Sequence, residues 1–352
     1  MSASACSTYP WLAPHWRRLF ADEARLHHAL LIAGQQGLGK LALAEQAAAA
    51  LLCEAQGSVP ADGPCGVCDS CRWHASGNHP DFRRVMPEQD EEGGGDAAAA
   101  KAPARKRGAP SIKIDQIRGL EGFVYVGSHR RGNRVILIAP AEAMNAAATN
   151  ALLKILEEPP AGVHFILVSM QWRRLLPTVR SRCRRVMIGR PDPAVARAWL
   201  AAAGVADAER LLQVTGGAPL AALAWSEAGR MTGYEAQLDA LAKPRDGMLA
   251  MAARWDAQLR ADAEGSLETL VETVEKWLVD LVHVKLYGAP RFHLAWRQSL
   301  ERLAGPAAVG RLFACYNELI GMRAIANHPV NSQLFLEDLA ARYLRALKAE
   351  SA

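Results

Sequence analysis

The sequence predicts an α/β domain followed by an all-α region, and three observations lead to this fold class. Short apolar runs alternate with helical patterns over the first 190 residues, which is typical of a parallel sheet covered by helices. A glycine-rich turn follows the first apolar run and opens a helix. Beyond residue 233 the apolar positions repeat with helical spacing almost throughout.

Five apolar runs have the length and composition of buried strands. They lie at Leu30–Ala33, Asp81–Val85, Val135–Ala139, His164–Ser169 and Arg184–Ile188. The first helix is expected over Leu41–Leu52, and another over Asn145–Glu158. The second of these ends before Pro159 and Pro160, because proline cannot continue the hydrogen-bond ladder of a helix.

Two prolines, Pro191 and Pro193, mark the end of the α/β domain, which we place at residues 1–190. A small helical region follows at 191–232, and Gly216 and Gly217 interrupt it. Residues 233–352 form a third, helical domain. Its strongest helical pattern runs from Leu267 to Val282 with apolar residues three and four positions apart.

The bulk composition is that of a globular protein: half of the residues are hydrophobic, 22% are charged, and the net charge is +5. This charge permits nucleic acid as a partner without requiring it. No apolar stretch reaches the length of about eighteen residues that a membrane helix needs, and Met1–Pro10 lacks the pattern of a secretory signal. Four of the seven cysteines are clustered, which favours the reducing cytoplasm over a disulfide framework.

The segment Glu88–Pro110 contains no aliphatic or aromatic residue larger than alanine, apart from its prolines, and its acidic half precedes its basic half. Such a segment buries too little apolar surface to offset the entropy of ordering. We interpret it as a flexible insertion, with a solvated spacer and a DNA-contacting basic half as the two alternatives.

The glycine-rich turn fits a phosphate-binding loop up to its last position. Gly34, Gly37, Gly39 and Lys40 stand where backbone N–H groups and a lysine would hold phosphates at the start of a helix. The last position requires the hydroxyl of Ser or Thr for magnesium, and Leu41 has no oxygen to offer.

The second half of a nucleotide-hydrolysing site is also missing. The strand Val135–Ala139 ends in Ala139 and Pro140, where an Asp and a Glu normally bind magnesium and polarise water. Glu142 follows two residues later, beyond the expected end of the strand. Hydrolysis at this loop is therefore not expected, although weak nucleotide binding through Lys40 and the backbone remains an alternative.

Four cysteines after the first helix have the spacing of a metal site: Cys53, Cys65, Cys68 and Cys71. Four thiolates at this spacing suit a closed, tetrahedral zinc site of structural type, with no position left for a reactive water. An iron–sulfur cluster or free thiols are the alternatives. No helix with paired Cys and His follows, so a DNA-reading finger is not favoured.

Four arginines lie in the six residues from Arg180 to Arg185, just before the last strand. They are either a solvated basic patch or an arginine presented to the nucleotide of a neighbouring subunit. A guanidinium delivered in this way neutralises the charge that develops on the transferred phosphoryl group.

Several motifs occur here in an order that resembles the clamp-loader subunits of bacterial DNA polymerase III, which are AAA+ proteins. They are the stretch His28–Lys40, the four cysteines, His79–Asp81, Asn150–Pro160 and Ser181–Cys183. The resemblance covers the α/β domain by motif, the small helical region by pattern, and the last domain by length and helicity only.

This resemblance implies a RecA-like AAA+ domain with a zinc module at about 53–75, a three-helix lid, and a helical collar that closes a pentameric ring. It implies that Cys53, Cys65, Cys68 and Cys71 are the zinc ligands and that Arg182 acts on the ATP of an adjacent tau or gamma subunit. It also implies a delta subunit in the ring, with the sliding clamp and primer–template DNA reached through the complex, and no membrane partner.

We expect a clamp-loader subunit that helps to assemble the ring, donates Arg182 and does not hydrolyse ATP. In the lid, Leu220 stands where active loaders keep an arginine. The first alternative is an active tau- or gamma-type ATPase, which requires a hydroxyl at 41 and an Asp–Glu pair at 139–140. The second is a zinc-dependent DNA-binding protein, which predicts tight, salt-sensitive binding of the isolated chain to DNA.

Overall fold

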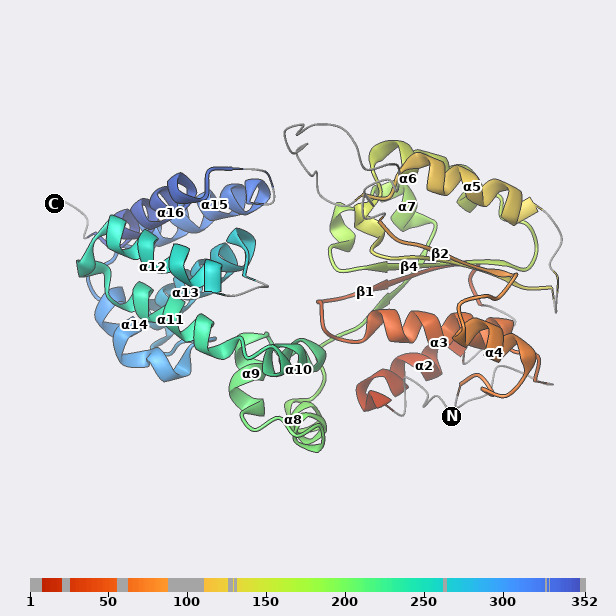
Figure 1. Cartoon of the computed structure of the whole chain (residues 1–352), viewed down its shortest axis with the longest axis horizontal. Helices are drawn as coiled ribbons and strands as arrows, with labels where there is room; N and C mark the ends of the chain where they lie inside the picture. Colours follow the sequence, from red (N-terminus) through yellow and green to blue (C-terminus); the bar gives the residue numbers. More distant parts are fainter. Residues whose placement is uncertain are drawn as a thin grey trace, which may run out of the picture. The chain divides into compact units, whose positions relative to one another are not determined.

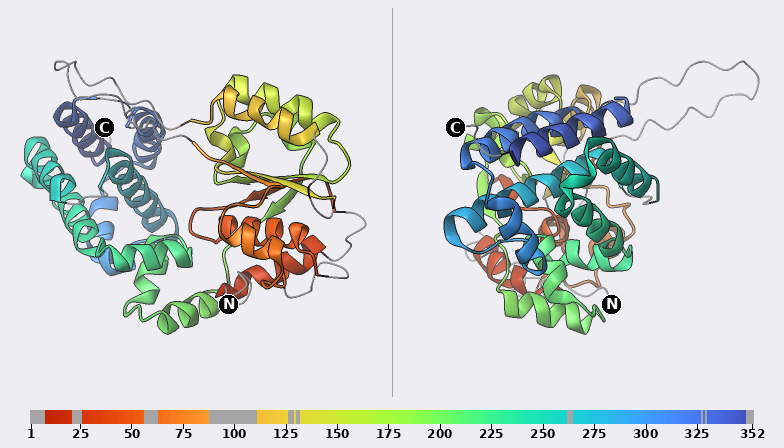
Figure 2. Two further views of the ribbon diagram at one scale, coloured as in Figure 1. Left: turned by 45° about the vertical axis from the view of Figure 1, so that its right-hand side comes forward. Right: turned by 90° about the vertical axis from the view of Figure 1, so that its left-hand side faces the viewer.

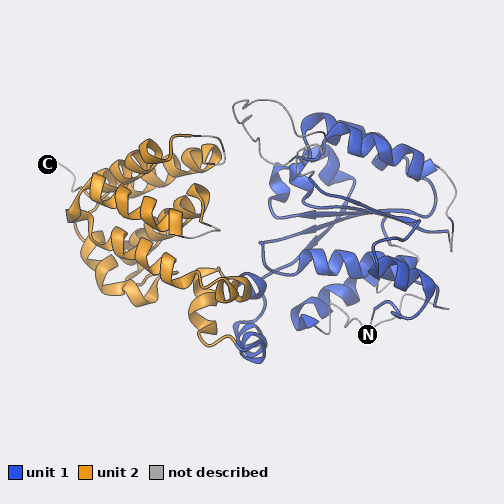
Figure 3. Cartoon of the chain, in the orientation of Figure 1, with its two compact units in different colours: residues 1–97, 110–204, 217–221 blue, residues 98–109, 205–216, 222–352 orange. Residues whose placement is uncertain are grey.

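A computed structural model of the chain describes residues 8–20, 26–55, 63–87, 111–125, 129, 132–261, 265–326, 328 and 330–348. The described residues form two compact units (Figure 3). Unit 1 contains those up to 204 together with 217–221, and unit 2 contains 205–216 and the residues from 222 onward. The expected insertion at 88–110 lies outside the described residues.

Unit 1 is built on a five-stranded parallel sheet in the order β2-β3-β4-β1-β5. The strands are β1 Ala29–Ala33, β2 Phe82–Val85, β3 Arg134–Ile138, β4 Val163–Ser169 and β5 Arg184–Met187. All five predicted strands are therefore confirmed to within one residue at each end. The predicted α/β class is confirmed with them.

Helices cover both faces of this sheet, as the two views in Figures 1 and 2 show. The helices of unit 1 are η1 Pro10–Leu12, α2 Ala13–Phe20, α3 Lys40–Leu52, α4 Asp69–Ala75, α5 Ile114–Tyr125, η3 Ala141–Ala143, α6 Ala146–Glu157, η4 Trp172–Arg174, α7 Pro177–Ser181 and α8 Pro193–Ala202, where η marks a 3-10 helix.

The two faces of the sheet bury alternate residues of each strand. Leu30 and Ile32 of β1 pack with α2 and α3 on one side, whereas Leu31 of β1 packs with α5, α6 and α7 on the other. A side chain period of two along a strand, with apolar residues at every position, produces this double burial. The phosphate loop at the end of β1 is thus fixed between two packed layers.

Unit 2 consists of helices. They are α9 Ala208–Val214, α10 Pro219–Glu227 from residue 222 onward, α11 Met231–Ala242, η5 Pro244–Asp246, α12 Met248–Ala261, α13 Leu267–Tyr287, η6 Leu294–Trp296, α14 Arg297–Ala304, α15 Val309–Ile325 and α16 Ser332–Ala346. Among the described residues, no helix has the length and apolar character needed to cross a membrane.

Helix α13 lies at the centre of the core of unit 2, and it follows the strongest helical pattern of the sequence. Ser266 and Thr269 form a capping box at its start, and Gly288 ends it with a φ of 75°. Trp277 is fully buried and donates its indole N–H to the Tyr343 hydroxyl oxygen of α16 at 2.9 Å. The expected lid region, 191–232, contains α8, α9 and α10, and the boundary between the two units passes through it.

Candidate functional site

The glycine-rich turn connects β1 to α3, in the place that the sequence predicts. Gly37 and Gly39 have φ values of 78° and 85°, a left-handed conformation that residues with a Cβ rarely adopt. Gly39 is the N-cap of α3 and Lys40 is its first residue. The backbone therefore has the course of a phosphate-binding loop.

The loop is in close contact with apolar residues from two other segments of unit 1. Leu220 donates its backbone N–H to the carbonyl oxygen of Gly37 at 3.0 Å, and a Cβ on Gly37 would lie 2.6 Å from the Cβ of Ala221. A Cβ on Gly39 would meet Leu12 at 3.2 Å and Tyr9 at 3.5 Å. The N-terminal segment and the start of α10 thus pack directly against the glycine-rich turn.

An aromatic cluster holds the N-terminal segment against this loop. Trp11 donates its indole N–H to the carbonyl oxygen of Leu38 at 2.9 Å. The ring of Trp11 lies edge-on to Trp199 of α8, with 5.3 Å between centroids. Trp199 in turn donates to the carbonyl oxygen of Thr8 at 2.7 Å. These contacts cover one side of the loop with apolar side chains.

Lys40 is turned back onto its own loop. Its side chain is buried and its Nζ donates to the carbonyl oxygen of Gln35 at 2.6 Å. Burial lowers the pKa of Lys40 to about 8, and the charge of Glu142 opposes part of this shift. The amine that would hold a phosphate is therefore engaged by a backbone oxygen.

Glu142 does not stand at the end of β3. It lies in η3, and its Oε1 accepts the backbone N–H groups of Met170 and Gln171 at 2.9 and 3.0 Å, just after β4. At the end of β3, Ala139 and Pro140 have no carboxylate, and Leu41 has no hydroxyl. The oxygen ligands that magnesium requires are absent from these three positions.

The four cysteines come together at the end of α3, as predicted. Cys53 is the C-cap of α3, Cys68 is the N-cap of α4 and Cys71 lies in its first turn. All four Sγ atoms lie within 4.8 Å of one another. The Cys53–Cys68 and Cys65–Cys71 pairs are 4.0 and 3.9 Å apart. Thiolates around one tetrahedral zinc at 2.3 Å lie about 3.8 Å apart, so the cluster fits a metal ion.

Backbone N–H groups point at these sulfurs. Cys68 donates to the Sγ of Cys65 at 3.4 Å, Cys71 to Cys68 at 3.4 Å, and Cys65 to Cys53 at 3.5 Å. Backbone hydrogen bonds, that of Val67 first, lower the pKa of Cys65 to about 6, whereas burial raises the pKa of Cys53 and Cys71. Donors of this kind stabilise the thiolate form that a metal ion binds.

Arg182 is the C-cap of α7 and lies just before the edge strand β5. Its Nη2 is 2.6 Å from Oε1 of Glu157, and its Nη1 donates to the carbonyl oxygen of Thr178 at 3.0 Å. About a third of its side chain is exposed, 34%. The guanidinium is thus held by its own chain at the surface.

Arg182 and the phosphate loop lie at opposite ends of the sheet. Arg184 pairs with Leu30 and Met187 with Ala33 in two parallel strands, so Arg182 lies beyond the amino end of β1. The loop begins after Ala33, at the carboxyl end. At 3.3 Å per strand residue the separation is roughly 20 Å, which is too far for this arginine to reach its own loop.

The other arginines near β5 surround one tryptophan. The guanidinium groups of Arg173, Arg180 and Arg185 lie 4.6, 5.4 and 4.4 Å from the ring centroid of Trp172. Cation–π contacts of this kind hold arginines against the protein surface. The basic stretch is therefore divided between a tryptophan-bound set and Arg182, which pairs with a carboxylate.

Sequence reasoning missed the residues that complete these sites. Glu157 was read only as part of the motif Asn150–Pro160, and Tyr9 and Leu12 were assigned no role. One signal was available: Glu157 is the last residue of α6, where a carboxylate faces the negative end of the helix dipole and is unfavourable. A partner cation was therefore to be expected nearby.

The sheet order, the glycine loop after β1 and the helical unit that follows define an AAA+-type nucleotide-binding fold. A family model described as DNA polymerase III, delta subunit, matches residues 14–192. The chain is 41% identical over 218 residues to the DNA polymerase III subunit delta' of Pseudomonas aeruginosa. It therefore belongs to the DNA polymerase III delta' family of clamp-loader subunits.

The P. aeruginosa match covers 61% of this chain and 60% of the relative. The delta' subunit of Escherichia coli is 32% identical over 239 residues, with 66% and 65% covered. This chain thus spans about three fifths of the length of the curated relatives it matches. The DNA polymerase III subunit tau of Salmonella typhimurium is 35% identical over 193 residues, with 50% and 26% covered.

Among solved structures, a DNA polymerase III gamma subunit-related protein of Thermotoga maritima aligns with 96% of this chain and 99% of its own. The sequence identity is 14% and the TM-score is 0.45.

Proposed function

We propose that this chain is a clamp-loader subunit that does not hydrolyse ATP at its own loop and that presents Arg182 to the ATP of a neighbouring subunit. It acts in the cytoplasm within a pentameric ring that contains delta and tau or gamma subunits. The ring loads the sliding clamp onto primer–template DNA.

The observation that carries this proposal is the position of Arg182 relative to the loop of the same chain. An arginine about 20 Å from its own nucleotide loop, partly exposed at an edge of the sheet, serves a nucleotide only if another subunit supplies it. The delta' and tau subunits among the relatives are consistent with such a partner.

The state of the loop supports the absence of hydrolysis. Leu41, Ala139 and Pro140 provide no magnesium ligand or base, and Leu220, Leu12 and Tyr9 pack on the glycine-rich turn. An active tau- or gamma-type ATPase would need oxygen ligands at these positions. We therefore keep that alternative below the proposed one.

The four cysteines are proposed to hold one structural zinc ion. They would fix the end of α3 to the start of α4, and a closed four-sulfur site leaves no position for a reactive water. The third candidate, a DNA-binding zinc protein, receives no specific support from this geometry. The three-domain division at 1–190, 191–232 and 233–352, with a lid and a collar, remains part of the proposal.

The test is the variant Arg182→Ala in a reconstituted clamp loader. Ring assembly, measured by gel filtration, is expected to be unchanged because the side chain is partly exposed and its one ion pair is weak. ATP hydrolysis at the adjacent site is expected to fall by about 10³-fold or more, as in other arginine-finger systems. A single-turnover ATPase measurement then loses the burst contributed by that site.

Arg118→Ala is the matched control, because Arg118 is an exposed arginine of unit 1 whose nearest carboxylate is 4.0 Å away. It is expected to leave the burst intact. A full burst in the Arg182→Ala ring would show that this arginine does not serve a neighbouring nucleotide.

A further inference from the structure

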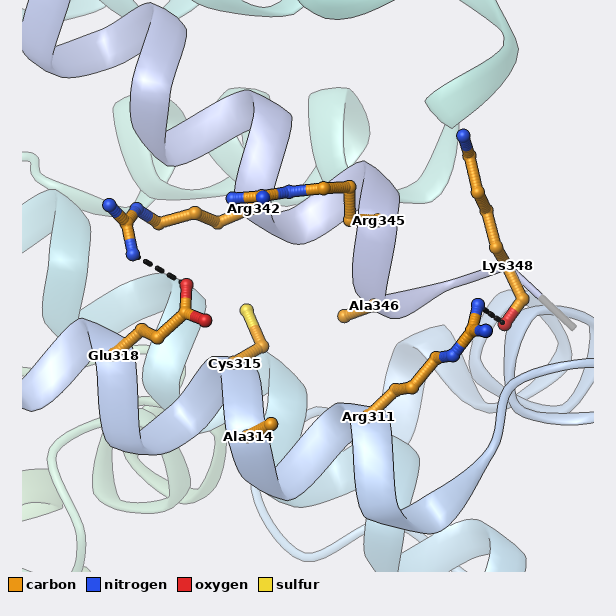
Figure 4. A pocket seen from close by; sticks show the side chains of 8 residues that line it. All are labelled: Arg311, Ala314, Cys315, Glu318, Arg342, Arg345, Ala346 and Lys348. Carbon is orange, nitrogen blue, oxygen red and sulfur yellow. Dashed lines mark hydrogen bonds and ion pairs between the residues drawn. The ribbon is translucent and has the colours of Figure 1, made fainter. Parts of the chain in front are cut away.

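A cavity of about 410 Å³ lies between α15 and α16 in unit 2, outside the residues matched by the family model. Figure 4 shows charged side chains converging on it from both helices. Those that line it are Arg311, Glu318, Arg342, Arg345 and Lys348. Four cations therefore face a single carboxylate.

That carboxylate is already engaged. Arg342 donates from Nη1 to Glu318 at 2.5 Å and from Nε to Asp338 at 2.9 Å. Arg342 is thus neutralised by two acids, and Glu318 has little charge left for the other cations. Close Arg–carboxylate pairs of this type satisfy both partners.

Arg345 is different. Among the described residues, no hydrogen bond or ion pair engages its guanidinium, which extends along the cavity toward Arg342 (Figure 4). Arg311 rises from α15 and donates to the carbonyl oxygen of Lys348 at 3.4 Å. The cavity therefore has a positive potential that Glu318 does not cancel.

Helix stability does not account for this arrangement. A cation in the last turn of a helix is favourable, and Arg345 lies in the last turn of α16. Arg311, however, lies in the first turn of α15, where the helix dipole disfavours a positive charge. Arg342 and Arg345 are also like charges three residues apart on one helix, which is mildly unfavourable.

The floor of the cavity is small and apolar. Ala314, Cys315 and Ala346 line it, and Cys315 is 4% exposed. Burial, with the charge of Glu318, raises the pKa of Cys315 to about 12, so its thiol stays neutral. None of the described residues that line the cavity is aromatic, so nucleic-acid bases find no ring to stack on.

We propose that this cavity binds an acidic peptide segment of a partner protein. Its carboxylates pair with Arg345 and Arg311, and a small apolar side chain rests on the floor formed by Ala314 and Ala346. Planar guanidinium groups match carboxylates in a two-point geometry. The volume is within the range of sites that hold a few side chains.

The test uses the full chain and a fluorescein-labelled probe peptide, Asp-Asp-Leu-Asp-Asp-Leu, followed by fluorescence anisotropy. The probe is expected to bind, and to bind less tightly as salt is raised, because the charges are partly exposed. Arg345→Glu is expected to weaken binding by at least about tenfold, which corresponds to about 1.4 kcal/mol. Lys348→Glu should weaken it less, because its side chain is turned away from the cavity in Figure 4.

The matched control is Arg260→Glu, an arginine of unit 2 whose side chain is 78% exposed. It should leave binding of the probe unchanged. Circular dichroism and the urea midpoint establish that each variant is folded, which is expected because Arg345 is exposed.

Two outcomes would overturn the proposal. One is equal affinity of the probe for the original chain and for folded Arg345→Glu. The other is a twelve-nucleotide oligo-dT that binds more tightly than the probe and loses affinity in Arg345→Glu, which would assign the cavity to nucleic acid. An Asp-to-Lys version of the probe should not bind.

Discussion

Arg182 and Glu157 form an ion pair with 2.6 Å between Nη2 and Oε1, and the two side chains come from different elements of the chain. Glu157 closes α6 and Arg182 closes α7. A carboxylate at the C-terminus of a helix costs about 0.3–1 kcal/mol, and a half-exposed ion pair returns a similar amount. The pair therefore contributes little to stability and mainly fixes the direction of the guanidinium.

Glu157→Gln tests whether this direction matters. We expect the reconstituted loader to lose part of the ATPase rate at the site that Arg182 serves, because the guanidinium no longer has a fixed orientation. The loss should be smaller than that of Arg182→Ala. Steady-state ATPase with primed DNA, measured over a range of ATP concentrations, should show the change in kcat rather than in KM.

The unfolding free energy of Glu157→Gln should change by less than about 1 kcal/mol. Glu158→Gln, one residue further along the chain and also exposed, is the control and should leave the ATPase rate unchanged. If both glutamine variants have the original rate, Glu157 has no part in positioning the arginine.

The isolated chain is expected to show negligible ATP hydrolysis, and Leu41→Thr alone should not restore it. A hydroxyl at position 41 gives magnesium one ligand, but Ala139 and Pro140 still provide no carboxylate, and Leu220 still packs on Gly37. Phosphate release measured with a coupled assay checks both chains. Turnover by the unmodified chain at the rate of an active loader would contradict this expectation.

Removal of one cysteine from the cluster should remove the metal. Cys65→Ser is expected to lower the zinc content from about one ion per chain to nearly none, because three thiolates and a hydroxyl bind zinc much more weakly. Inductively coupled plasma mass spectrometry measures the content. Cys315→Ala, a buried cysteine outside the cluster, should keep the zinc. Equal zinc in both variants would place the metal elsewhere.

Asp280 should contribute to stability in a pH-dependent way. Its carboxylate is fully buried and accepts the backbone N–H groups of Arg291, Phe292 and His293, as well as Nδ1–H of His293 at 2.7 Å. Burial raises the pKa of Asp280, but the hydrogen bond and charge of His293 and the backbone donors outweigh it. The pKa is therefore held below its ordinary value of 3.8.

A depressed pKa in the folded state stabilises the fold above pH 3.8, and this stabilisation is lost as the pH falls below that value. Asp280→Asn should therefore lower the unfolding free energy by roughly 1–3 kcal/mol at pH 7, and by less at pH 3. Urea unfolding at both pH values measures this. Asp239→Asn, an exposed partner of Lys243, should change little at either pH. An undiminished gap at pH 3 would disprove the linkage.

Much of the fold follows from short-range patterns. The five strands are continuous apolar runs, and burial on both faces is the only environment that suits them. The end of α6 is set by Pro159, and that of α13 by Gly288. The cysteine cluster was predictable because all four positions lie within 19 residues, close enough that a helix end and one turn bring them together.

The sequence by itself determined the class of the fold, the missing magnesium ligands at Leu41, Ala139 and Pro140, and the group of four thiols. Only the tertiary structure decided that Leu220 and Tyr9 pack on the loop, that Glu157 holds Arg182, and that Arg311 and Arg345 meet across α15 and α16. The physical reason is that these partners are 25 or more residues apart, so their contacts depend on how elements pack rather than on any local periodicity.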